Sequence, residues 1–257
     1  WCYTDRFSFR PGENVALRVS TTADTWDFTI ARDGHVEDTV LTAKDLPGIH
    51  HETPEDCSIA GCSWPVAYEF TIPEDWRSGA YLVTLTGHRG AESVEEHHLF
   101  VLRRSKSQKP APILLLCATG TWVAYNCWGG SNAYEGLTGP EGNRFSPVLS
   151  MERPWTRGFC KLPPGAPRTV HDTPPRPGEM ARYPYMEWAY AYGYSKKYAS
   201  AGWATYERHF LVWAERCGYA VDCATLHDLE TDPGLLDAYP CIVMVGHDEY
   251  WSRNMRE

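Results

Sequence analysis

A change in the spacing of hydrophobic residues near position 110 constrains the fold of this chain most. Before this point, apolar and polar residues alternate in short segments, which is typical of half-buried strands. After it come unbroken apolar runs and one helical periodicity. A polar, proline-ended stretch separates the two patterns, so we expect two units: residues 1–106, a linker at 107–112, and residues 113–257.

The first unit has the pattern of a β-sandwich. Turn-forming pairs such as Asp33-Gly34 and Pro47-Gly48 separate its alternating segments. The segments expected to be strands are residues 14–20, 25–30, 67–72, 80–86 and 97–102. Several short strands with regular turns favour two packed antiparallel sheets.

The second unit alternates between apolar runs and a helical pattern. Residues 113–118 are almost wholly apolar, and shorter strand candidates lie at 219–223 and 241–245. Between Trp203 and Cys217, apolar side chains recur every three or four residues, which predicts an amphipathic helix. Strands alternating with helices indicate a parallel-sheet α/β domain, similar to that of glutamine amidotransferases.

Two parts of this α/β domain depart from the pattern. Three parallel strands make a thin sheet, so we expect the domain to be incomplete at Glu257, with a following segment or second polypeptide adding strands. Residues 137–198 form an insertion rich in proline and tyrosine, too long for an ordinary connection. We expect it to form either a lid or binding surface, or an ordered insertion that packs against the sandwich or a partner.

Polar and aromatic residues follow two of the expected strands. Residues 246–252 (GHDEYWS) come after the strand at 241–245, and residues 124–130 (AYNCWGG) come soon after the strand at 113–118. Open α/β sheets bind their ligands at the carboxyl ends of strands. The sequence therefore predicts a functional site that combines the two clusters.

The first of these clusters has two interpretations. Continued strand alternation would place His247 and Glu249 on one face, and Asp248 and Tyr250 on the other. Alternatively, the segment is a surface loop in which Ser252 caps a following helix and Glu249 is solvated.

Both clusters resemble segments of the large (beta) subunit family of N,N-dimethylformamidase. The resemblance extends to residues 229–239 (LETDPGLLDAY) and to residues 3–8 (YTDRFS) near the start. It covers most of the chain and is weakest in the middle. It implies a hydrolase that cleaves the C–N bond of a small amide.

The resemblance also implies a cofactor and roles for particular residues. Enzymes of this family hold one iron ion with two tyrosines and one glutamate, assisted by a histidine. On that pattern Tyr125 and Glu249 are candidate iron ligands, and His247 is the candidate catalytic base. Asn126 and Trp155 are candidate substrate-binding residues. The implied partners are a small amide substrate, a small subunit or second polypeptide, and further copies in an oligomer.

The second tyrosine ligand is absent from its expected place. The family has an Arg-Pro-Tyr segment where this chain has Arg153-Pro154-Trp155, and an indole offers no anionic oxygen to iron. Either a ligand is missing or the tyrosine-rich insertion provides one. The insertion's candidates are Tyr183, Tyr185, Tyr190, Tyr192 and Tyr194.

The residue types suit this chemistry independently of the resemblance. Phenolate and carboxylate are hard oxygen ligands, as a ferric ion prefers. Such an ion polarises an amide carbonyl and acidifies a bound water. A nearby histidine accepts the proton of that water and passes it to the leaving amine.

Composition excludes several classes of partner. The net charge of -9 and the lack of a long basic run argue against nucleic acid and anionic membrane surfaces. No apolar run approaches the roughly 20 residues of a membrane-spanning helix. The chain has no leader-like segment and nine cysteines, several within apolar segments, so we expect a cytoplasmic protein with free thiols.

Two other functional classes remain open. The 11 tryptophans and 15 tyrosines are compatible with a non-catalytic module that binds carbohydrate or a protein partner through aromatic rings. The α/β pattern also allows a cysteine nucleophile, for which Cys117 and Cys127 are the candidates near a strand end. Neither lies in a glycine-flanked nucleophile turn, which weakens this class.

Overall fold

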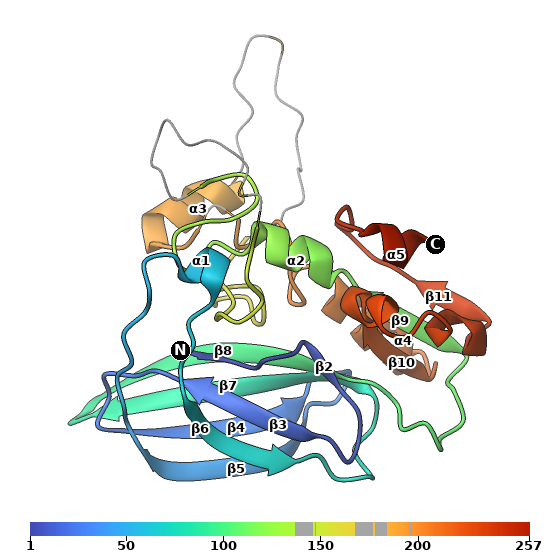
Figure 1. The fold of residues 1–257 in the computed structure, drawn as a ribbon, viewed down its shortest axis with the longest axis horizontal. Helices are drawn as coiled ribbons and strands as arrows, with labels where there is room; N and C mark the ends of the chain where they lie inside the picture. Colours follow the sequence, from blue (N-terminus) through green and yellow to red (C-terminus); the bar gives the residue numbers. More distant parts are fainter. Residues whose placement is uncertain (137–145, 147, 168–176, 178–183, 196) are drawn as a thin grey trace.

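The described part of the chain is built mainly from three β-sheets with a few short helices (Figure 1). The computed structural model describes residues 1–136, 146, 148–167, 177, 184–195 and 197–257. Much of the expected insertion at 137–198 therefore lies outside the described residues, as does Tyr183. Within the described ranges, no helix has the length and apolar character needed to cross a membrane.

Two of the sheets pack as a sandwich, as the alternating segments predict. The first sheet contains β1 (Cys2–Tyr3), β3 (Asn14–Val19) and β6 (Val66–Thr71), paired antiparallel. The second has the order β2 (Ser8–Phe9), β8 (Glu92–Leu102), β7 (Gly79–Arg89), β4 (Thr25–Arg32) and β5 (Asp38–Pro47). Side chains from both sheets, including Leu17, Phe28 and Phe100, form one buried core between them.

The third sheet is parallel, as expected for the second half of the chain. Its order is β10 (Val221–Thr225), β9 (Ile113–Cys117) and β11 (Cys241–Val243). Ile113 lies opposite Val221 on one side and Cys241 on the other, so all three carboxyl ends face the same edge. The strand expected at 241–245 is shorter, ending at Val243, and the one expected at 219–223 begins two residues later.

The amphipathic helix α4 is also shorter than its sequence pattern. It spans Glu207–Arg216, whereas the apolar periodicity begins at Trp203. Trp203 is fully buried in the turn before the helix, and its indole nitrogen donates to Asp33 Oδ2 at 2.7 Å. The apolar periodicity therefore covers more residues than the helix, and it does not follow burial throughout, since Trp213 is 55% exposed.

The parallel sheet and the sandwich share the largest apolar core. On the sandwich side this core contains Leu82 and Leu99, and on the other side Leu115 and Leu211. Polar contacts reinforce the junction, among them a nearly buried ion pair of 2.6 Å between Arg32 Nη2 and Glu215 Oε1. Apolar side chains from both sides of residues 107–112 therefore pack in one core. The division into two domains, and the glutamine-amidotransferase-like character of the second, stay predictions.

Helix α2 (Thr119–Tyr125) begins directly after β9, at the carboxyl edge of the parallel sheet. A buried carboxyl group on α4, that of Glu207, holds the first turn of α2 in place. Glu207 Oε1 accepts hydrogen bonds from the backbone N–H of Ala118 at 3.1 Å and from the indole N–H of Trp122 at 3.0 Å. The start and inward face of α2 are thus held by one side chain.

The remaining elements are short. They are α1 (Cys57–Ala60), α3 (Pro184–Tyr192), α5 (Arg253–Arg256) and two 3-10 helices at Leu226–Glu230 and Leu235–Ala238. Ser252 caps α5 by accepting a hydrogen bond from the N–H of Met255 at 3.1 Å, as one interpretation of residues 246–252 expects. Figure 1 shows α2 and the parallel sheet above the same side of the sandwich.

Replacing Glu207 by glutamine should alter how stability depends on pH. Burial raises the pKa of Glu207 to about 8, so the folded chain binds a proton there that the unfolded chain releases near its ordinary value. The contribution of Glu207 to stability should therefore fall by a few kcal/mol as pH rises from about 5 to 9. Burial lowers the pKa values of His97, His98 and His227, and these groups act in the opposite direction. Glu207→Gln should remove the fall that Glu207 contributes, as measured by urea unfolding at each pH.

The exposed carboxylate of Glu37 provides a matched control. Glu37→Gln should keep the wild-type pH dependence. Equal pH dependence of wild type and Glu207→Gln would show that Glu207 is already ionised in the folded protein.

Candidate active site

Three of the residues singled out in the sequence meet at the carboxyl edge of the parallel sheet. Tyr125 ends α2, while His247 and Glu249 lie in the loop after β11. The phenol of Tyr125 donates to Glu249 Oε1 at 3.2 Å, and His247 Nε2 lies 3.2 Å from Glu249 Oε2. Side chains that are 124 residues apart thus share one cluster.

A second tyrosine, which the sequence did not single out, completes the cluster. Tyr134 Oη lies 2.6 Å from Glu249 Oε1 and 2.9 Å from Tyr125 Oη. Tyr250 donates in turn to Tyr134 Oη at 2.7 Å. We refer to Tyr125, Tyr134, His247 and Glu249 as the phenol–carboxylate cluster.

The loop after α2 folds back on the helix and so brings Tyr134 to Tyr125. The backbone N–H of Ala133 donates to the carbonyl of Ala124 at 2.9 Å. Asn132 Oδ1 accepts from the N–H of Tyr134 at 2.8 Å and from that of Glu135 at 3.1 Å, a local turn typical of asparagine. The one signal in the sequence is therefore Asn132, a turn residue shortly after the Gly129-Gly130 pair.

Two glycines let the loop after β11 approach its neighbours. Gly246 has φ +72°, and a Cβ atom there would lie 2.2 Å from the ring of Tyr206. A Cβ atom on Gly120 would lie 2.2 Å from the carbonyl oxygen of Tyr250. Because glycine has no Cβ, both close contacts are possible without a clash. The loop then lies near enough to α2 for the N–H of Glu249 to donate to Thr121 Oγ1 at 3.0 Å.

The loop does not continue the alternation of the strand. Tyr250 was expected on the face opposite Glu249, yet its hydroxyl joins the same cluster through Tyr134. Asp248 accepts a hydrogen bond from the indole N–H of Trp251 at 3.0 Å. The cause is that β11 ends at Val243, so the residues that follow are not held in an extended pleat.

At neutral pH the carboxylate of Glu249 is ionised, and the phenols of Tyr125 and Tyr134 are neutral. Partial burial acts to raise the pKa of Glu249, but hydrogen bonds from Tyr134 and His247 outweigh it and lower the pKa overall. Burial raises the pKa of Tyr125, with the charge of Glu249 adding to the effect. Burial and the hydrogen bond to Glu249 raise the pKa of Tyr134 strongly. Both phenols therefore keep their protons in the absence of a cation.

Contacts on both sides fix the His247 ring. Its Nδ1 lies 2.9 Å from the carbonyl oxygen of Ser200, which can only accept, so Nδ1 carries a proton. This leaves Nε2 facing Glu249. The side chains of His247 and Glu249 are 29% and 43% exposed, so a small molecule can reach both.

Asn126 and Trp155 lie beneath the surface. Asn126 is 2% exposed; its amide donates to the carbonyl of Pro154 and accepts from the N–H groups of Trp128 and Thr156. Trp155 is 3% exposed and packs in the shared core. Both side chains support the loop around the cluster in this conformation, and their expected contact with substrate stays a prediction.

The tyrosines of the insertion that the structure describes gather elsewhere. Tyr185 and Tyr194 pack in a separate cluster with Trp188 and the fully buried Tyr198. Tyr192 stacks on Trp188, with ring centroids 4.7 Å apart. The side chain of Tyr190 lies outside the described residues. The phenol next to Tyr125 comes instead from Tyr134.

The spacing of the oxygen atoms fits a small, hard cation. The oxygens of Tyr125, Tyr134 and Glu249 are separated by 2.6, 2.9 and 3.2 Å. Adjacent ligands of an octahedral ion with bonds of about 2.0–2.1 Å are about 2.9 Å apart. Among the residues that the structure describes, no group of three or more His, Cys, Asp or Glu side chains could hold a metal ion. The candidate donor set is thus two phenols and one carboxylate.

The two cysteines considered as nucleophiles are poorly placed for that role. Cys117 is fully buried in β9, and burial raises its pKa well above the ordinary value. Burial also raises the pKa of Cys127, whose sulfur accepts hydrogen bonds from Asn132 and Ser195. Since the thiolate is the reactive form, both environments disfavour nucleophilic attack.

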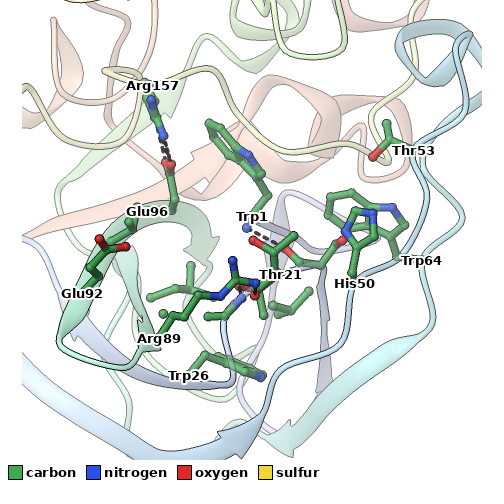
Figure 2. Close-up of a pocket in the computed structure, with 17 residues that line it drawn as sticks. Trp1, Thr21, Trp26, His50, Thr53, Trp64, Arg89, Glu92, Glu96 and Arg157 are labelled. Carbon is green, nitrogen blue, oxygen red and sulfur yellow. Dashed lines mark hydrogen bonds and ion pairs between the residues drawn. The ribbon is translucent and has the colours of Figure 1, made fainter.

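A separate cavity of about 470 Å³ lies against the sandwich (Figure 2). Figure 2 shows Trp26 and Trp64 in its wall and charged side chains, such as Arg89 and Glu92, around it. None of the residues that line it belongs to the phenol–carboxylate cluster. Trp26 and Trp64 are 3% and 2% exposed, so they present little ring surface to a ligand.

Two comparisons give partial likenesses. A sialyltransferase from Photobacterium damsela matches 43% of this chain and 18% of its own, with 11% identity and a TM-score of 0.20, too low to support an argument about fold. The N,N-dimethylformamidase beta subunit of Alcaligenes sp is 29% identical over 93 residues. That match spans 36% of this chain and 11% of the relative.

A third comparison covers nearly the whole chain. Residues 26–257 match the family described as N,N-dimethylformamidase beta subunit-like, C-terminal. The match includes every member of the phenol–carboxylate cluster. The chain belongs to the N,N-dimethylformamidase beta subunit-like, C-terminal family.

Proposed function

We propose that this chain carries the active site of a metal-dependent hydrolase that cleaves the C–N bond of a small amide. The observation that carries the proposal is the convergence of two phenols, one carboxylate and one imidazole at an exposed edge of a parallel sheet. The name of the Alcaligenes relative, an N,N-dimethylformamidase beta subunit, supports the same reaction class.

Tyr125, Tyr134 and Glu249 are the residues that would hold a ferric ion. All three offer hard oxygen atoms, and their mutual spacing suits ligands of one ion. When bound, a ferric ion supplies the Lewis acidity that polarises an amide carbonyl and acidifies water. Tyr134 would then be the second tyrosine ligand, which the family resemblance implied at the position of Trp155.

His247 is placed to move protons in the reaction. The carbonyl of Ser200 orients its ring through Nδ1 and leaves Nε2 directed into the cluster. When His247 is neutral, with its proton on Nδ1, Nε2 can take a proton from the attacking water and return it to the leaving nitrogen. The hydrogen bond from Nε2 to Glu249 belongs to the protonated ring. Glu249 Oε2, 3.2 Å away, stabilises the imidazolium that exists between these transfers.

The alternative of an aromatic-rich binding module has less support. Sugar binding through aromatic rings needs exposed ring faces. Of the three tryptophans that line the cavity in Figure 2, Trp26 and Trp64 are almost fully buried, and Trp1 is partly buried. The hydrolase proposal, by contrast, uses side chains that are both clustered and accessible.

Association with another polypeptide is part of the proposal. The Alcaligenes relative is named as a beta subunit, which implies an assembly with at least one other subunit. We propose that this chain likewise acts within such an assembly, which would also complete the three-stranded parallel sheet.

The hydrolase proposal predicts iron binding that depends on three side chains. The wild-type protein should bind one equivalent of ferric ion and show a phenolate-to-iron charge-transfer band in the visible spectrum. Tyr125→Phe, Tyr134→Phe and Glu249→Gln should each weaken or abolish binding, because each removes one oxygen ligand. Elemental analysis and visible absorption measure these effects.

A tyrosine outside the cluster controls for general effects of the substitution. Tyr219 is 51% exposed, and Tyr219→Phe should retain both the iron and the band. Full iron content and an unchanged band in Tyr134→Phe would refute the assignment of the second phenol.

His247→Gln should separate proton transfer from metal binding. We expect its rate of amide hydrolysis to fall by about 10²–10⁴-fold, the usual contribution of a general base, while iron content stays at the wild-type level. His88→Gln, which alters a surface contact with Asp27 on the sandwich, should leave the rate unchanged. A wild-type rate for His247→Gln would exclude the proposed role.

A further inference from the structure

Lys197 lies beside the phenol–carboxylate cluster in a segment fixed at both ends. On one side, the hydroxyl of Ser195 donates to Cys127 Sγ at 2.9 Å and accepts from the N–H of Lys197 at 3.0 Å. On the other side, the carbonyl of Ser200 contacts His247, and Tyr198 is fully buried. The backbone at Lys197 is therefore anchored to both loops that build the cluster.

The ammonium group of Lys197 lies over the two phenol rings. Its Nζ is 4.8 Å from the ring centroid of Tyr125 and 4.5 Å from that of Tyr134. Ring faces attract a cation within about 6 Å. They hold the ammonium in place without neutralising it, since an aromatic quadrupole carries no net charge.

Among the described residues, Lys197 has no partner that cancels its charge. Its Nζ forms no ion pair with a described carboxylate and no hydrogen bond with the oxygens of Tyr125, Tyr134 or Glu249. By comparison, Lys161 is paired with Glu95 at 3.3 Å. Lys197 is thus an available positive charge at the edge of the cluster, outside its group of oxygen atoms.

The charge balance of the site indicates what this cation could bind. A ferric ion with two phenolates and one carboxylate would sum to zero, so these ligands would leave the charge of Lys197 uncancelled. Glu135, the nearby carboxylate next to Tyr134, forms no ion pair with Lys197. A neutral amide gives that charge no partner. One negative charge on the substrate, a short distance from the amide carbonyl, would balance it.

We propose that Lys197 is the specificity-determining residue of this site and that the substrate is a small amide bearing a carboxylate group. The proposal rests on the hydrolase function proposed above and adds the substrate class. A single ammonium matches the single charge of a carboxylate. Its place over the ring faces, without a hydrogen bond to the cluster oxygens, suits contact with a second group of the substrate and leaves the reacting carbonyl to the cluster.

The test compares N-formylglycine with its neutral analogue N-formylglycinamide, using the iron-loaded protein. The wild type should favour the carboxylate substrate by about tenfold or more in kcat/KM, mainly through a lower KM. Lys197→Met should lose this preference while its kcat/KM for the neutral analogue changes little, and Lys197→Arg should keep part of it because the charge is retained. The exposed Lys161→Met should behave as the wild type.

Two outcomes would overturn the proposal. One is equal kcat/KM of the wild type for the two compounds. The other is an equal fall for both in Lys197→Met, which would place the ammonium at the reacting carbonyl.

A second test measures the affinity of the protein for the same two compounds by calorimetry and does not depend on turnover. If neither compound is hydrolysed, the proposed reaction fails for them, but tighter binding of N-formylglycine that disappears in Lys197→Met still supports the carboxylate site. Equal binding of both compounds by the wild type refutes it.

Discussion

The parallel pairing of β9 with both β10 and β11 is the constraint on which the candidate site depends. Because the strands run in the same direction, the segments that leave β9 and β11 emerge at one edge of the sheet. One of these segments becomes α2 and ends at Tyr125, and the other carries His247 and Glu249. Buried Glu207 fixes where α2 begins, and Gly120 and Gly246 let the second segment lie against its neighbours. The direction of the strands and close backbone contacts thus bring the side chains of the candidate site together.

The members of the candidate site that come soon after strands could be predicted from the sequence to lie together. Tyr125, His247 and Glu249 come soon after apolar runs, and parallel strand order is enough to bring them together. Tyr134 and Lys197 could not be found in this way. Tyr134 reaches the cluster through a turn closed by Asn132, and Lys197 through anchors at Ser195 and Ser200. Such contacts depend on the path of irregular loops, which hydrophobic periodicity does not encode.

The same distinction applies to the fold. Alternating segments with regular turns were sufficient to predict five of the sandwich strands, but β1, β2 and β5 were missed. β1 and β2 have two residues each, and most residues of β5 are exposed, so it has no clear apolar face. The helix pattern beginning at Trp203 extended beyond α4 because Trp203 is buried in the turn before the helix, where an apolar side chain matches the same spacing. The linker expected at 107–112 stays a prediction. It gave no sign that Leu82 and Leu99 of the sandwich would pack in one core with Leu115 and Leu211.

The hydrogen bonds of the cluster also explain how it could keep its geometry without a cation. Glu249 is ionised, and the protons of Tyr125 and Tyr134 hold its Oε1 at short distance, so the three oxygens stay together instead of repelling one another. A hard cation would replace those two protons at nearly the same oxygen positions, with little rearrangement of the side chains. Preorganised donors lower the cost of binding because their conformational freedom is already lost on folding. Tyr250, which donates to Tyr134 from outside the cluster, would remain hydrogen-bonded in both states and restrain the phenol oxygen as its proton leaves.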